Sequence, residues 1–205
     1  MKKLLLVGAI ALFGAMNAQK NTILVGGNIS LLSSKDKFGS TTISESNTFT
    51  FSPRIGYQFT DNWTAGVRLG VETEKTTEQI TGTSYEGTIK TNNFTYGVFG
   101  RYTQPLSETF AVFGELDVYA SNGKETFSTN APGNFSSTTK TTGFGVMFTP
   151  NLFINFKNSF GLNFNIGGLG YETSKIKDTD IKTNQFGFGF GKGVTVGISK
   201  NFGVK

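Results

Sequence analysis

The chain has 205 residues, among them 27 Gly and 21 Phe but only 4 Pro, one Trp, and no Cys or His. This composition favours strands and turns over helices, and it excludes disulfides, cysteine nucleophiles and the usual Cys and His zinc sites. The formal net charge of +5 is modest, and the lysines fall mostly in polar intervals between the expected strands, which argues against binding of nucleic acid.

The first 18 residues have the pattern of a secretory signal peptide. Lys2 and Lys3 form a positive start, residues 4–13 an apolar stretch, and Met16-Asn17-Ala18 a small-residue cleavage site. Cleavage after Ala18 would leave residues 19–205 as a single domain and would lower the formal charge from +5 to +3. The apolar stretch is too short for a membrane-spanning helix, and no Cys follows it for lipid attachment. The sequence therefore predicts an exported protein with neither kind of anchor.

The remainder of the chain alternates apolar and polar residues with a period of two, as half-exposed strands do. From Phe49 to Phe59, for example, most odd-numbered positions are aromatic or aliphatic, whereas the even-numbered ones are Thr, Ser, Arg, Gly and Gln. The alternation predicts eight strands, at residues 23–32, 49–59, 63–72, 94–103, 110–119, 144–156, 160–166 and 186–202.

The strands come in repeated hairpins, each with a very short turn beside an aromatic residue. Copies of this unit cover residues 53–70, 98–118 and 146–169, and a half-copy covers residues 194–202. A repeated supersecondary unit indicates one element stacked on itself. Because the unit is a hairpin, we expect antiparallel strands that close into a barrel.

The apolar face of this barrel is expected to point outward. An eight-stranded barrel has room inside only for side chains or one small ligand, and the many Phe, Tyr, Leu and Ile residues would overfill it. The opposite face is rich in Gly, Thr, Ser and Asn, which would fit. This argument favours a barrel in lipid over a soluble barrel of lipocalin shape.

Aromatic residues at the strand ends support a membrane barrel. One set, here called the turn-side girdle, lies beside the short turns or at the end of the last strand. A second set, the outer aromatic ring, lies at the opposite strand ends. The ten residues from Phe49 to Phe59 span about 33 Å of strand, or about 25 Å after a tilt of ~40°, which is the height of the apolar band of such barrels. The turn-side girdle is Tyr57, Phe59, Trp63, Tyr102, Phe110, Phe156, Phe160 and Phe202, and the outer aromatic ring is Phe49, Phe94, Phe144 and Phe186.

The connections are unequal in length. Those near residues 60, 106 and 157 take only a few residues, whereas residues 33–46, 74–91, 122–140 and 173–183 form long polar intervals. Short turns on one side and long loops on the other are typical of bacterial outer-membrane barrels. The predicted fold class is all-β: an eight-stranded antiparallel up-and-down transmembrane barrel with short periplasmic turns and long extracellular loops.

These features together resemble the small eight-stranded outer-membrane barrels of the OmpA transmembrane-domain and OmpX type. The resemblance covers the chain from about residue 20. One departure is that Gly203-Val204-Lys205 follow the terminal aromatic Phe202, where such barrels commonly end on the aromatic residue itself. The resemblance implies a monomer in the outer membrane of a Gram-negative bacterium, inserted by the barrel-assembly machinery and in contact with outer-membrane lipid. It also implies that an extracellular ligand would bind through the long loops.

The predicted lumen carries charge. All three arginines of the chain, Arg54, Arg68 and Arg101, fall on the inward face, together with Glu72, Glu115 and Asp117. Charges in a narrow interior must pair or meet water, and guanidinium groups suit carboxylate partners. The pattern favours a structural network that fills the barrel over a gated ion path, a ligand-binding lumen, or a glycosidase-like pair of carboxylates.

No catalytic, cofactor-binding or metal-binding residue is predicted, and we expect no enzyme. The stretch from Gly187 to Gly193 resembles a phosphate-binding loop only superficially, because it alternates with a period of two and lacks the Ser or Thr that follows the lysine of such loops. The hypothesis is a structural or adhesion-like surface protein. A narrow porin and a secreted lipocalin-like carrier remain alternatives.

Overall fold

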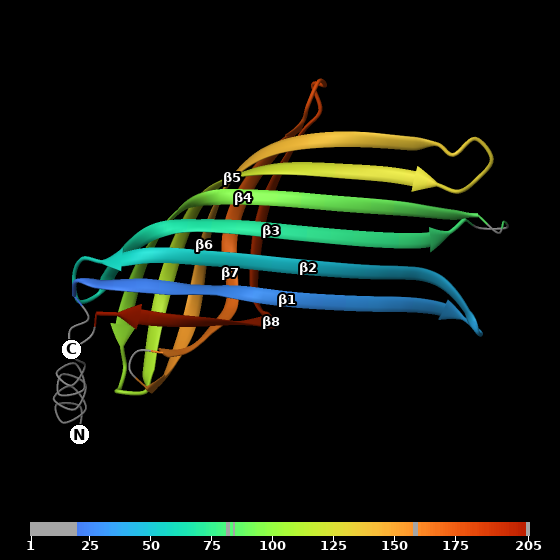
Figure 1. Cartoon of the computed structure of the whole chain (residues 1–205). Coiled ribbons are helices and arrows are strands. Elements are labelled where there is room, and N and C mark those ends of the chain that lie inside the picture. The colour runs from blue at the N-terminus through green and yellow to red at the C-terminus, as the bar shows by residue number, and fades with distance from the viewer. Residues whose placement is uncertain (1–19, 81–82, 84, 158–159, 204–205) are drawn as a thin grey trace.

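The fold is a closed antiparallel barrel in which each strand pairs with its neighbours in the sequence (Figure 1). The computed structural model describes residues 20–80, 83, 85–157 and 160–203, without the side chains of residues 157 and 192–194, so the predicted signal peptide lies outside the described residues. No helix in this part of the chain is long and apolar enough to cross a membrane. The predicted eight-stranded all-β class is confirmed. The strands are β1 (Thr22–Phe38), β2 (Thr41–Gln58), β3 (Trp63–Gln79), β4 (Glu86–Pro105), β5 (Phe110–Thr129), β6 (Ser136–Lys157), β7 (Phe160–Ile176) and β8 (Lys182–Phe202).

The strands are longer than the apolar alternation predicts. Most residues of the four polar intervals expected as loops belong to paired strands, and β1 and β2 are joined by residues 39–40 alone. Thr is β-branched and favours strands, and cross-strand hydroxyl contacts join Thr77 to Thr88 at 3.3 Å and Thr126 to Thr138 at 3.2 Å. The long connections are therefore extended hairpins rather than irregular loops. We call this end of the barrel the hairpin end, and the end with residues 59–62 and 106–109 the turn end.

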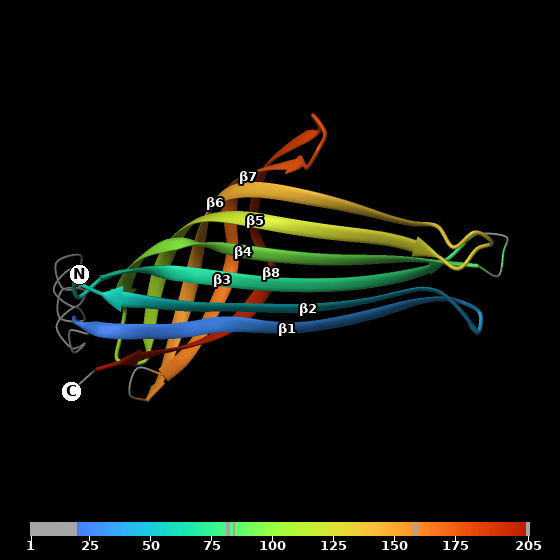
Figure 2. The same ribbon diagram turned by 45° about the horizontal axis from the view of Figure 1, so that its top comes forward.

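The hairpins extend well beyond the part of the barrel that a membrane requires. The strands have 17 to 22 residues, or about 56–73 Å at ~3.3 Å per residue, whereas a tilted transmembrane strand needs about 9–11 residues. Figure 2 shows β1 to β6 running out together as one curved sheet on the hairpin side. About half of each strand thus lies outside the apolar band.

The barrel closes through a short seam between its first and last strands. In the described residues the ladder of β1 with β8 runs only from Ile23–Phe202 to Gly27–Ile198. Beyond it, β7 and β8 bend away from β1 (Figures 1 and 2). The bend coincides with two glycines in left-handed backbone conformations, Gly167 at φ +136° and Gly191 at φ +73°, and with a register shift between Asn165 and Gly167. The outer halves of β1 and β8 are therefore separated.

Apolar side chains point outward along most of the barrel wall. Tyr57, Val67 and Leu116 are about half exposed, whereas the inward Leu24 and Phe99 are only 4% and 3% exposed. An apolar outer surface suits lipid and contradicts the alternative of a soluble lipocalin-like carrier.

Candidate functional site

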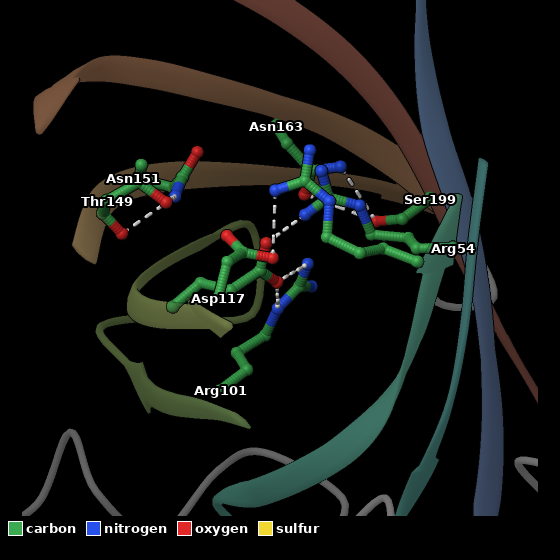
Figure 3. Close-up of polar contacts among 9 residues, drawn as sticks. Arg54, Arg101, Asp117, Thr149, Asn151, Asn163 and Ser199 are labelled. Atoms are coloured by element: carbon green, nitrogen blue, oxygen red, sulfur yellow. Dashed lines mark hydrogen bonds and ion pairs between the residues drawn. The ribbon is translucent and has the colours of Figure 1, made fainter. Parts of the chain in front are cut away.

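A cluster of charged side chains lies inside the barrel, where β2 to β5 face the interior. The register positions it: Arg54 of β2 is directly opposite Arg68 of β3, and Arg101 of β4 is opposite Glu115 of β5. Since side chains alternate along a strand, all four point inward together. Figure 3 shows Arg54 and Arg101 reaching from different strands toward the centre of the cluster, where Asp117 also lies.

Glu115 is the centre of this cluster. It is 1% exposed, and one of its oxygens accepts hydrogen bonds from Nε of Arg101 at 2.9 Å and from Nη2 at 2.7 Å. Its other oxygen accepts a hydrogen bond from Nη1 of Arg54. Arg68 and Asp117 form a second ion pair beside it, at 3.1 Å. Two guanidinium groups thus share one carboxylate through charge-assisted hydrogen bonds, the strong class of such bonds.

Two aromatic rings lie near the guanidinium group of Arg101. The Cζ atom of Arg101 lies 3.9 Å from the ring centroid of Phe113 and 5.8 Å from that of Phe99. Both rings are buried, so the cation–π contact forms away from water, where it is strongest. Alternation places both residues on the inward face, but only the register across β4 and β5 brings them against the guanidinium group.

Gly145 leaves room for a large side chain to extend across the barrel interior. The ring of Tyr119 occupies the space that a Cβ atom at Gly145 would need, and its hydroxyl lies 3.4 Å from Glu172 of β7. Arg68 lies over the same ring, with its Cζ atom 5.3 Å from the centroid. A row of contacts therefore runs from β3 to β7, and Gly residues make room for it.

Glu72 lies outside the cluster. It is on the inward face as predicted, but it is paired in register with Asn93 and accepts a hydrogen bond from that amide at 3.4 Å. Four residues separate it from Arg68, which is about 13 Å along a strand. The structure thus brings together five of the six predicted lumen charges: Arg54, Arg68, Arg101, Glu115 and Asp117.

A polar cavity of about 630 Å³ adjoins the cluster. Besides the charged residues, its lining includes the amides of Asn28, Asn151 and Asn163, none of which was predicted to contribute. The three arginines on the wall are balanced by Glu115, Asp117 and Glu172, so the cavity has no net charge. No group of three or more carboxylates that could hold a metal ion occurs among the described residues. The chemistry of the wall suits water or a neutral polar solute.

The turn-side girdle lies on the outside of the barrel. All eight residues are exposed, from 41% for Tyr102 and Phe160 to 61% for Phe156. Trp63 and Tyr102 meet edge to face, with centroids 5.1 Å apart, and Lys200 lies 5.1 Å from the centroid of Phe202. Aromatic rings with a nearby lysine are typical of a membrane–water boundary.

Comparison with known proteins identifies the family. Among solved structures, the crystal structure of Ail, the attachment invasion locus protein of Yersinia pestis, is 19% identical, and the alignment covers 89% of this chain and 99% of that chain with a TM-score of 0.35. No curated protein matches the chain. Residues 4–192 match the family described as outer membrane protein beta-barrel domain, in agreement with the resemblance seen in the sequence. The chain belongs to this family, and the protein is a β-barrel of the outer membrane.

Proposed function

We propose that the protein is a non-catalytic surface-interaction protein, in which the barrel anchors a sheet that reaches beyond the membrane. The observation that carries this proposal is the continuation of paired strands far past the outer aromatic ring. A barrel that only filled the membrane would need strands of about half this length. In this proposal the turn end faces the periplasm and the hairpin end the cell exterior.

An exposed strand edge supports an interaction role. Beyond Gly27, the described ladders of β1 are with β2 alone, and Leu31 and Phe38 on this edge are 80% and 81% exposed. A strand with one free edge can pair with an extended segment of another chain. The part of this edge beyond the membrane is the place where we expect a protein partner to bind.

A shortened hairpin tests this proposal. Residues 35–45, the outer part of the exposed β1 edge, are removed, and Asn-Gly joins Ser34 to Ser46, which are partners in register. We expect the variant to fold, because the barrel below is unchanged, and to lose most of the adhesion seen with the full chain. The measurement is the number of cells displaying each form that remain on a panel of immobilised matrix glycoproteins.

The control is the mobility shift on boiling, which must be the same for both forms in SDS gels. Adhesion that is unchanged by the deletion would contradict a role for this hairpin. The equivalent deletion in the β5–β6 hairpin, in which Asn-Gly replaces residues 127–137 between the partners Thr126 and Thr138, leaves the exposed β1 edge in place and should keep the adhesion.

Buried side chains in the lumen support a barrel without conductance. Leu24 and Phe99 are buried on the inward face, and Phe113 and the Arg101–Glu115 pair, also buried, line the cavity. We expect the refolded protein to give no single-channel steps in a planar bilayer. Stable steps that change size in Arg68→Ala would instead support the narrow-porin alternative.

A further inference from the structure

Lysines lie on the outside of the barrel just beyond the outer aromatic ring. In three strands a lysine lies four residues from a phenylalanine of the outer aromatic ring, on the side toward the hairpin end. Because side chains alternate, this spacing puts the lysine on the same outward face as the phenylalanine, about 13 Å further from the turn end. The three pairs are Phe94 with Lys90, Phe144 with Lys140, and Phe186 with Lys182.

These lysines stand opposite other lysines. In each of the last three hairpins, two exposed lysines are direct partners across the strands. Like charges in this position destabilise a sheet, so an anion between them would relieve the repulsion. The six residues, here called the lysine collar, pair as Lys75–Lys90, Lys124–Lys140 and Lys175–Lys182.

Carboxylates of the barrel do little to neutralise the collar. At the same level Glu72, Glu74 and Glu125 alternate onto the inward face, opposite to the lysines. On the outward face, Asp180 has a fully exposed carboxylate 3.9 Å from Lys175. Glu45, the ion-pair partner of Lys35, also interacts with Lys75. Exposed pairs of this kind contribute little. The charge of the collar is therefore largely available to a ligand.

The first hairpin provides a contrast. At the equivalent place Lys35 is opposite Glu45, and the two form an ion pair at 3.1 Å. A hydrogen bond from Asn47, together with Lys35, lowers the pKa of Glu45, because both neighbours stabilise the charged carboxylate. Lys35 is thus matched by its own partner, and it offers a natural control for the collar.

One part of the collar forms a groove of about 310 Å³. Two collar lysines, Lys124 of β5 and Lys140 of β6, line it together with Lys177 of the turn after β7, and no carboxylate contributes to it. Phe94 and Val71 line its membrane-side end. Three ammonium groups above an apolar floor fit a ligand that has a phosphate at one end and hydrocarbon at the other.

We propose that the lysine collar binds phosphate groups of the lipids in the leaflet crossed by the hairpins, with the β5–β6 groove as its tightest site. The outer aromatic ring marks the edge of the apolar band. The collar lies just beyond it, at the height where lipid headgroups are found. This site is separate from the exposed edge of β1, so it does not depend on the proposed adhesion role.

The test uses the full chain refolded in nanodiscs of phosphatidylcholine with added lipid A. The Lys124→Gln/Lys140→Gln double variant is compared with Lys35→Gln, and lipid A retained after purification is quantified by mass spectrometry. Two interfacial lysines contribute about 1 kcal/mol each, so we expect about thirtyfold weaker retention of diphosphorylated lipid A in the double variant. Retention is expected to be unchanged in Lys35→Gln, and dephosphorylated lipid A should bind all forms weakly.

A second measurement separates binding from folding. In zwitterionic detergent without lipid A, the double variant should be as stable as the original chain or slightly more stable, because it removes a repulsive pair. Equal retention of phosphorylated and dephosphorylated lipid, or an equal loss in Lys35→Gln, would overturn the proposal. Inositol hexakisphosphate binding in detergent as tightly as lipid A would also overturn it, since the site would then serve a soluble polyanion.

Discussion

Replacement of Glu115 by Ala is expected to lower the free energy of unfolding by about 3–5 kcal/mol, the usual cost of removing one partner from a buried ion pair. The variant leaves Arg54 and Arg101 facing each other in the interior without the carboxylate that both contact. The estimate for buried pairs applies, rather than that for surface pairs, because the Glu115 side chain is 1% exposed. Urea unfolding of the refolded barrel, followed by gel mobility, measures the loss.

Two further variants define the origin of this effect. Glu115→Gln keeps the shape of the side chain and removes its charge. If electrostatics dominate, this variant should lower the free energy of unfolding nearly as much as Glu115→Ala does. Glu72→Ala removes a carboxylate on the same face that lies outside the cluster, and it should cost less than about 1 kcal/mol. Equal costs for Glu72→Ala and Glu115→Ala would contradict the central role assigned to Glu115.

Substitution of Gly97 by Val is expected to prevent closure of the barrel or to lower its stability by about 3 kcal/mol or more. A Cβ atom at Gly97 would lie 2.7 Å from both Cα and Cβ of Tyr119 on the neighbouring strand. Backbone atoms cannot move aside as a flexible side chain can, so the strands themselves would have to separate. The measurement is the fraction of protein that shows the boiling-dependent gel shift after refolding.

Gly100 of the same strand provides the matched control. A Cβ atom there has no atom within 4 Å, and alternation from the inward Gly97 places it on the outward face. Gly100→Val should therefore fold as the original chain does. If Gly100→Val fails to the same degree as Gly97→Val, then β-propensity or insertion into lipid, rather than crowding inside the barrel, explains the defect.

The inward position of the charged residues could be predicted because strand alternation is strict. Arg68 and Asp117 needed only their parity to be placed in the lumen. Their partners could not be predicted, since Arg54 and Glu115 are 61 residues apart and meet only through the registers of three successive ladders. The displacement of Glu72 from the cluster has the same origin, because parity fixes the face but not the height along the barrel.

The polar hairpins escaped prediction for another reason. In residues 74–79 and 86–91 both faces carry mostly Thr, Glu, Gln or Lys, with Ile89 the one large apolar residue, so little apolar contrast marks the period of two. The strand pattern becomes visible only once Lys75 and Lys90 are known to be partners. The lysines then gather on one outward face, whereas the sequence suggested that they are dispersed. The glycine bend at Gly167 also lacks a distinct signal, because Gly is frequent throughout the inward face.

The unequal ladders determine how the molecule would respond to mechanical force. A partner that pulls on the hairpin tips applies tension parallel to β1–β6, so the hydrogen bonds of each long ladder share the load in shear. The seam from Ile23–Phe202 to Gly27–Ile198 has few bonds to share any load that reaches it. Under tension we therefore expect this seam to yield first, while the paired sheet held by the partner stays intact.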